Sequence, residues 1–180
     1  MVDNQNMESE DGWVGETSFF SETALIFNES NFDDKLLAKY ERVVWINGCF
    51  DLLHRGHLNI IRQAARNGDC LVIGINSDES VRTLKGHGRP INSENERALT
   101  LAEIPGVKFV IIFKGNAPES IIKKVNPKVV LKDEIYESID YPEKKILANL
   151  GCEVKYLEHL EGISSTVLEK RIQKVTSNGS

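Results

Sequence analysis

His54 and His57 are the residues whose type and spacing first indicate chemistry. They follow the apolar run 43–46 and the dipeptide Asn47-Gly48, an order that predicts a strand, a tight turn and a helix. The spacing places both imidazoles on one face of the first helical turn, with Cβ atoms about 5–6 Å apart. In a parallel sheet this turn lies at the carboxyl end of the strand, where the helix N-terminus favours a bound phosphate. We therefore expect both rings to donate hydrogen bonds to phosphate oxygens and to stabilise developing charge.

Two simpler interpretations of the histidine pair remain open. The rings are unrelated, semi-buried groups, or they are ligands of a zinc ion. Zinc needs further ligands, and the only other histidines in the chain are His87 and His159. Gly56, between the two rings, favours ligand binding because it leaves the backbone open to close approach.

The charge of the chain is distributed unevenly. Residues 1–34 hold nine acidic groups and no Lys or Arg, so the rest of the chain has 22 basic and 18 acidic residues. We expect residues 1–28 to form an acidic, partly disordered extension and residues 29–176 to form one domain. A slightly basic domain suits a small anionic substrate, and we expect no nucleic-acid partner, which would need a denser basic patch.

The apolar runs and the cysteines indicate the cellular compartment in which the protein is expected. No apolar run approaches the roughly 20 residues that cross a bilayer, and the acidic start differs from a basic signal peptide. Cys49, Cys70 and Cys152 are widely spaced and odd in number, as expected for reduced thiols. We expect a cytoplasmic protein that does not contact a membrane.

Strand-like and helix-like segments alternate along the chain. This alternation predicts an α/β fold with a doubly wound, five-stranded parallel sheet. Ser93 and Glu96 form a capping box at a helix start, and Asn67-Gly68 predicts a left-handed helix stop. A further short strand within residues 23–27 is possible. The five strands are expected at residues 43–46, 70–75, 109–113, 129–132 and 153–157.

The segment 47–57 resembles the signature G-x-F-D-x-x-H-x-G-H of the cytidylyltransferase-like nucleotidyltransferases. Within that family the chain looks most similar to the adenylyltransferase domain of D-glycero-β-D-manno-heptose 1-phosphate adenylyltransferases. The resemblance covers about residues 30–175. The further motifs that carry it are INSD at 75–78, LKGHGRPI at 84–91, the segment 94–97 and GISST at 162–166.

The resemblance implies a role for each matching residue. His54 and His57 would stabilise the α-phosphate, and Lys85, in the flexible basic loop expected at residues 82–90, would neutralise phosphate charge as a third catalytic group. Arg97 and Lys114 would hold the acceptor substrate, although a surface position is equally expected for Arg97. Asp51 would fix the turn. The nucleotide would contact Gly48, Cys49, Phe50, Gly56, Lys132, Asp133, Gly162, Ile163, Ser164, Ser165 and Thr166.

Two positions depart from the heptose enzymes. Residues 132–136 read K-D-E-I-Y where those enzymes usually read K-G-G-D-Y, so a loop near the nucleotide is reshaped. Lys114 stands where they are often acidic and where glycerol-phosphate cytidylyltransferases have lysine. These differences leave the acceptor and the nucleotide open.

The expected reaction is transfer of a nucleoside monophosphate, AMP from ATP, to a sugar phosphate such as heptose 1-phosphate, with release of pyrophosphate. Mg²⁺ is expected as cofactor, held mainly by the triphosphate rather than by protein ligands. The alternatives are a CTP-dependent cytidylyltransferase for a polyol phosphate, amino-alcohol phosphate or phosphonate, and a nucleotide-binding regulatory module without turnover. The family also implies a homodimer.

Overall fold

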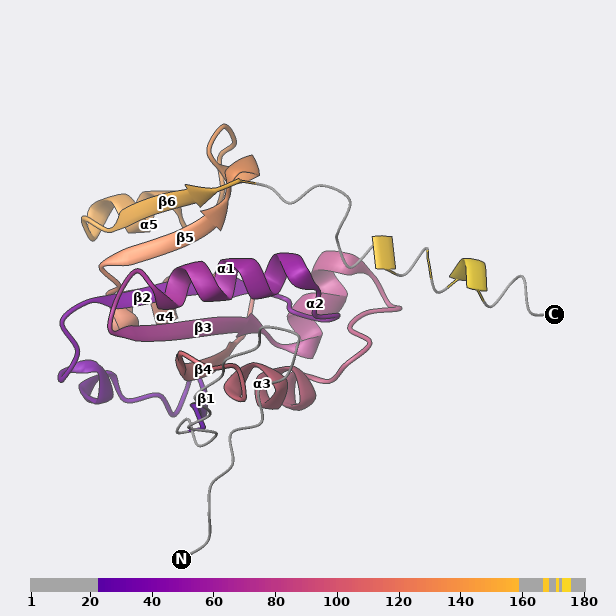
Figure 1. Cartoon of the computed structure of the whole chain (residues 1–180), viewed down its shortest axis with the longest axis horizontal. Coiled ribbons are helices and arrows are strands. Elements are labelled where there is room, and N and C mark those ends of the chain that lie inside the picture. The colour runs from indigo at the N-terminus through magenta and orange to yellow at the C-terminus, as the bar shows by residue number, and fades with distance from the viewer. Residues whose placement is uncertain (1–22, 159–166, 169–170, 172, 176–180) are drawn as a thin grey trace, which may run out of the picture.

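A computed structural model describes residues 23–158, 167–168, 171 and 173–175 of the chain. Its centre is one sheet of six parallel strands in the order β1-β4-β3-β2-β5-β6 (Figure 1). The expected parallel, open architecture is therefore confirmed. The strands are β1 (Leu25–Asn28), β2 (Val43–Gly48), β3 (Cys70–Asn76), β4 (Val107–Phe113), β5 (Val129–Asp133) and β6 (Glu153–Leu157).

The number of strands was underestimated by one, because β1 is a full member of the sheet. It pairs in parallel with β4, with Leu25 opposite Phe109. The sheet thus begins inside residues 1–28, the segment expected to be an extension. The possible short strand within residues 23–27 corresponds to β1, a four-residue edge strand whose mostly exposed side chains give no apolar pattern.

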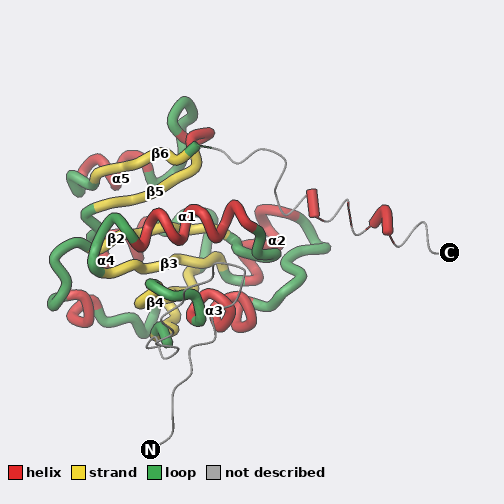
Figure 2. The backbone as a smooth tube through the Cα atoms, in the orientation of Figure 1, coloured by secondary structure: helices red, strands yellow, loops and turns green. Residues whose placement is uncertain are grey.

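Helices cover both faces of the sheet, and each face has its own apolar cluster. On one face, α1 (Arg55–Ala65) and α3 (Glu94–Ala102) pack against the side chains of β2, β3 and β4. On the other, α4 (Glu119–Val125), α5 (Lys144–Asn149) and the 3-10 turn η1 (Asp34–Leu37) cover a cluster around Trp45. Figure 2 shows α1 crossing in front of the strands. The sequence of β3 is almost continuously apolar because every residue of this strand is buried.

Asn67-Gly68 does follow α1, but its expected left-handed conformation is wrong, since neither residue has a positive φ. The glycine is needed for space instead. A Cβ atom at Gly68 would lie 2.0 Å from the carbonyl oxygen of Arg42. Residue 68 must therefore be glycine because two backbone segments approach closely at this position.

The strand order reverses between β2 and β5. These strands pair only through Val44 with Val129 and Trp45 with Val130, and then continue without further pairing. A reversal of this kind opens a crevice at the carboxyl ends of parallel strands, where ligands bind. The helix α2 (Asp78–Lys85) and the 3-10 turn η2 (Glu134–Tyr136) follow β3 and β5 at the same edge.

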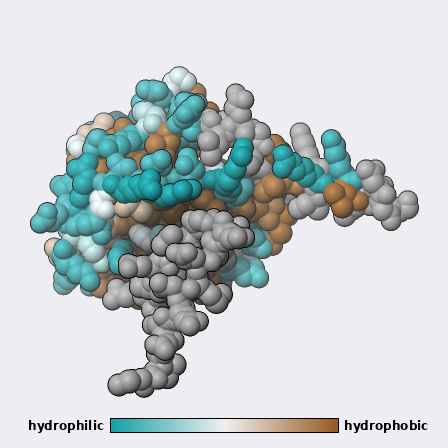
Figure 3. Space-filling model, viewed as in Figure 1, coloured by the Kyte–Doolittle hydropathy of each residue, from teal (hydrophilic) through white to brown (hydrophobic). Residues whose placement is uncertain are grey.

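The surface seen in Figure 3 is mainly hydrophilic, with smaller apolar areas. Within the part of the chain that the structure describes, no helix has the length and apolar character needed to span a membrane.

Candidate active site

A cavity of about 540 Å³ lies at the reversal between β2 and β5. Residues from the ends of both strands line it, together with α1, the end of α2 and the segment that leads into α5. Among its lining residues are Gly48, Cys49, Phe50, His54, Gly56, His57, Lys85, Lys132 and Asp133. One cavity therefore collects most of the residues that the sequence singled out.

The two histidines stand together at the start of α1. His54 is the N-cap residue, with extended backbone (φ −144°), and His57 lies in the first turn. Their rings are stacked, with centroids 3.8 Å apart and planes inclined by 24°. Gly56 permits this stack, because a Cβ at that position would lie 3.0 Å from Cε1 and Nδ1 of His54. The absence of a side chain at residue 56 thus shapes the pair.

The environment of the rings favours neutral imidazoles. Desolvation by burial, followed by repulsion from His54 and Lys85, lowers the pKa of His57 to about 4. Burial and the positive charge of Lys85 also lower the pKa of His54. Nδ1 of each ring is buried and has no hydrogen-bond partner within the described residues. The cavity thus holds two neutral imidazoles beside the cation Lys85.

Lys85 lies on a helix rather than in a flexible loop, which corrects the expectation for residues 82–85, while residues 86–90 lie outside the helices. It is the last residue of α2, whose N-cap Ser77 accepts a hydrogen bond from the backbone N–H of Ser80. Its side chain lines the cavity, and its charge acts on both histidines. A helix end holds this cation more firmly than a free loop would.

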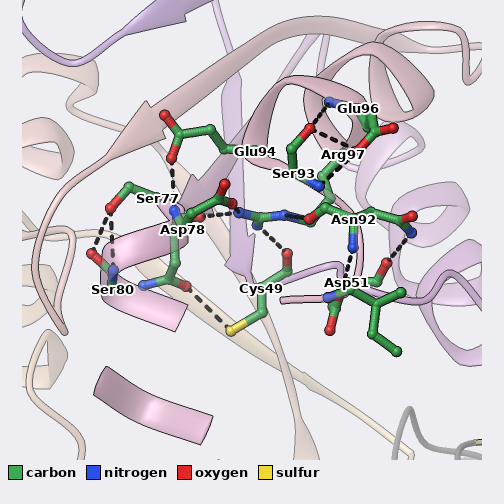
Figure 4. A network of polar contacts seen from close by, with 12 residues as sticks. Cys49, Asp51, Ser77, Asp78, Ser80, Asn92, Ser93, Glu94, Glu96 and Arg97 are labelled. Carbon is green, nitrogen blue, oxygen red and sulfur yellow. Dashed lines mark hydrogen bonds and ion pairs between the residues drawn. The ribbon is translucent and has the colours of Figure 1, made fainter. Parts of the chain in front are cut away.

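Arg97 was expected to bind substrate or to lie on the surface, and the structure supports neither position. Its side chain is 2% exposed. It donates to the carbonyl oxygens of Cys49 (2.6 Å), Asn76 (2.8 Å) and Asn92 (3.1 Å) and pairs with Asp78 at 2.8 Å (Figure 4). With its donors directed at these groups, Arg97 fixes the ends of β2 and β3 instead of contacting a ligand.

Asp51 anchors the same turn from the other side, as expected. Its carboxylate accepts hydrogen bonds from the backbone N–H groups of Ile91 (2.7 Å) and Asn92 (3.1 Å) and pairs with Arg89 at 2.6 Å. Although desolvation opposes it, these donors together lower the pKa of Asp51. The Asn92 side chain donates back to the Asp51 carbonyl at 2.7 Å, as Figure 4 shows. The segment before α3 therefore holds the turn before α1.

Phe50 completes the turn in an unusual conformation. Its φ of 49° lies in the left-handed region, which residues other than glycine rarely adopt. Its ring packs on His57, with centroids 5.1 Å apart. A Cβ at Gly48 would lie 3.3 Å from the Phe50 ring, so the glycine gives that ring room. The turn is shaped to support the histidines.

A second cluster of polar side chains, centred on Lys132, also lines the cavity. Lys132 is buried, pairs with Glu143 at 2.6 Å and lies over the rings of Tyr136 and Tyr141, at 5.1 and 4.7 Å from their centroids. Asn47 also reaches Glu143, at 3.4 Å. The sequence indicated Lys132 but missed Glu143, Tyr141 and Asn47. Pro142 marks a helix start there, and no residue type or spacing marks Glu143 as part of a site.

The remaining expected residues divide into two groups. Lys114 follows β4, is exposed and is absent from the lining of the cavity. Gly162, Ile163, Ser164, Ser165 and Thr166 lie outside the described residues.

The cavity's donors suit an anion. Among the described residues there is no group of three or more His, Cys, Asp and Glu side chains placed to hold a metal ion. His54, His57 and Lys85 offer N–H groups, which are partners for phosphate oxygens. This donor set suits the oxygens of a phosphate group.

Comparison with known proteins agrees with this geometry. A model of the cytidylyltransferase-like family matches residues 45–171. The bifunctional protein HldE of Wolinella succinogenes is 42% identical over 132 residues, which are 73% of this chain and 27% of that protein. HldE of Campylobacter concisus is 38% identical over 172 residues, covering 87% of this chain and 35% of the relative. The chain spans about a third of the length of these relatives.

Solved structures share the fold. The lipopolysaccharide core biosynthesis protein from Thermoplasma volcanium superposes with a TM-score of 0.52 at 24% identity, covering 67% of this chain and 97% of that one. Pantothenate synthetase from Thermus thermophilus gives a TM-score of 0.56 at 16% identity, over 83% of this chain and 70% of that one. At these identities the likeness supports the fold alone.

A parallel sheet with stacked histidines at its strand reversal, taken with these relatives, defines a nucleotidyltransferase. The chain belongs to the cytidylyltransferase-like family.

Proposed function

We propose that the chain transfers AMP from ATP to D-glycero-β-D-manno-heptose 1-phosphate and releases pyrophosphate. The observation that carries the proposal is the stacked pair of His54 and His57 beside Lys85 in one cavity at the strand reversal. The motifs shared with heptose 1-phosphate adenylyltransferases and the HldE relatives support the choice of nucleotide and acceptor.

The acceptor's phosphate monoester is itself the nucleophile. One of its oxygens attacks the α-phosphorus of ATP, the new P–O bond forms, and the bond from the α-phosphorus to the bridging oxygen of the β-phosphate breaks. That oxygen leaves with its electron pair as part of pyrophosphate. Because the monoester is already an oxyanion at pH 7, the step needs alignment and charge stabilisation rather than a strong base.

The chain's own residues supply both. His54 and His57 would donate N–H groups to oxygens of the α-phosphate, and Lys85 would neutralise charge that spreads toward the leaving group. Arg97 and Asp51 would keep the turn in place without touching the substrates. Mg²⁺, bound to the triphosphate, would neutralise part of its charge.

Pyrophosphate release tests the proposal directly. ATP and CTP are each combined with heptose 1-phosphate, glycerol 3-phosphate and choline phosphate, and the ratio kcat/KM is measured for every pair. We expect the highest value for ATP with heptose 1-phosphate. A preference for CTP, or for another acceptor, would replace the proposed reaction, and ATP binding without pyrophosphate release from any pair would indicate a regulatory module.

A further inference from the structure

The cavity has two polar lobes that lie on opposite faces of the sheet. The histidine lobe contains His54, His57 and Lys85, and the second lobe contains Asn47, Lys132 and Glu143. Residues alternate between the faces along a strand. Trp45 and Val130 pack in the cluster of the α4/α5 face, so Asn47 and Lys132, two positions further along β2 and β5, lie on that same face. The histidine lobe follows the face covered by α1. Both lobes open into one cavity.

Glu143 organises the second lobe. Its Oε1 accepts from Nζ of Lys132 at 2.6 Å and from Nδ2 of Asn47 at 3.4 Å. The orientation of the Asn47 amide is set by Trp45, whose Nε1 donates to Oδ1 at 3.2 Å. Within the described part of the chain, Oε2 of Glu143 accepts no hydrogen bond. One carboxylate oxygen is thus engaged by two donors, and the residue that carries it lines the cavity.

Stability alone gives little reason for this arrangement. Lys132 and Glu143 are 7% and 5% exposed, and a buried ion pair of this kind is often no more stabilising than apolar side chains of similar volume. A carboxylate beside an amide and an ammonium group on a cavity wall is, however, what a ligand with several hydroxyl groups requires. Hydroxyls donate to the carboxylate and accept from the nitrogen groups.

The second lobe is also a poor binding site for phosphate and for quaternary ammonium groups. The Glu143 carboxylate offers a phosphate only acceptor oxygens, whereas the histidine lobe offers the cation Lys85 and the imidazole N–H donors. A quaternary ammonium group would normally bind over aromatic rings. Here Lys132 already occupies the faces of Tyr136 and Tyr141, so these rings do not form a free cage.

We propose that Asn47, Lys132 and Glu143 form the acceptor subsite, which binds the uncharged, polyhydroxylated body of the acceptor while its phosphate points to His54 and His57. This subsite rests on the proposed function for the identity of the acceptor. It moves Lys132 from the expected nucleotide contacts to the acceptor contacts, and it adds Glu143 and Asn47 as specificity-determining residues.

Glu143→Gln tests the subsite, with Glu137→Gln as matched control on an exposed residue outside the cavity lining. Binding of heptose 1-phosphate is measured by calorimetry in the presence of a non-hydrolysable ATP analogue, and binding of the analogue alone is measured separately. Loss of a hydrogen bond to a charged group predicts about 10–100-fold weaker binding of heptose 1-phosphate in Glu143→Gln. Analogue binding should stay near that of Glu137→Gln, whereas the melting temperature should fall, because buried Lys132 loses its charged partner.

The outcomes separate this inference from the proposed reaction. Equal affinity for heptose 1-phosphate in the two variants, or no binding by the wild-type protein, would overturn the subsite. Tighter binding of choline phosphate than of heptose 1-phosphate would overturn it too. Binding that depends on Glu143 in a protein that releases no pyrophosphate would support the subsite and contradict the proposed reaction.

Discussion

Nη1 of Arg97 lies 2.6 Å from the carbonyl oxygen of Cys49, so a side chain of α3 holds the turn that presents the histidines. The same guanidinium contacts the Asn76 carbonyl at the end of β3. Arg97 thus joins two strand ends and one helix at the rim of the cavity. Its role is to position the groups that face the ligand.

Replacing Arg97 by Met should destabilise the protein strongly. The change leaves the carbonyl groups of Cys49 and Asn76 and the carboxylate of Asp78 without their buried donor, and breaking such a pair costs about 3–5 kcal/mol. Urea unfolding monitored by circular dichroism measures the loss. Arg62→Met, at an exposed position on α1, is the control and should change stability by less than about 1 kcal/mol. Similar unfolding midpoints for the two variants would contradict the role of Arg97.

Gly56→Ala should separate activity from stability. The added Cβ would meet the His54 ring at 3.0 Å and displace it, and a small displacement predicts a decrease in kcat of about tenfold. Alanine favours the helix over glycine, so the melting temperature should stay constant or rise. At Gly88 a Cβ meets no atom within 4 Å, so Gly88→Ala should keep the wild-type kcat. Unchanged kcat in Gly56→Ala would show that the stacked geometry does not matter for turnover.

His57→Ala should lower kcat by about 10²–10³-fold in the pyrophosphate assay, because a preorganised donor to the α-phosphate is lost. His87→Ala changes an exposed histidine and should leave kcat unchanged. Nearly normal turnover in His57→Ala would exclude His57 from catalysis.

The low pKa of His57 predicts acid sensitivity. Its pKa is about 4 in the folded protein against about 6.5 when unfolded, so the unfolded chain binds more protons between these values. The stabilising contribution is complete above pH 6.5 and is lost as the pH falls toward 4. The difference between the urea midpoints at pH 7 and pH 4.5 should therefore be smaller in His57→Gln than in the wild type. An equal loss of stability in both proteins would mean that His57 is not held neutral.

The sequence predicted the features that depend on local contacts. The capping box of Ser93 and Glu96 is confirmed, since it involves four successive residues. All five expected strands were placed to within two residues at each end, because buried strands have continuous or alternating apolar runs. The place of His54 at the start of α1 followed from the same strand-turn-helix pattern.

Features that depend on tertiary contacts could not be read in this way. The burial of Arg97 follows from where α3 packs, and an exposed and a buried arginine look alike in a sequence. Residues 82–85 were expected in a loop because the glycines at 86 and 88 follow them, but they form the last turn of α2. Glu143 joins Lys132 and Asn47 only after β5 and α5 are folded beside β2.

Phe50 shows how the fold determines the site. A left-handed phenylalanine costs about 1–3 kcal/mol, so residues 49–51 would relax to another conformation in an isolated peptide. Contacts from residues 89–97, far along the chain, hold them in place. The conformation of the turn before the histidines therefore forms only when that distant segment has docked. A fragment that ends after α1 would contain the complete histidine motif and still lack the binding conformation.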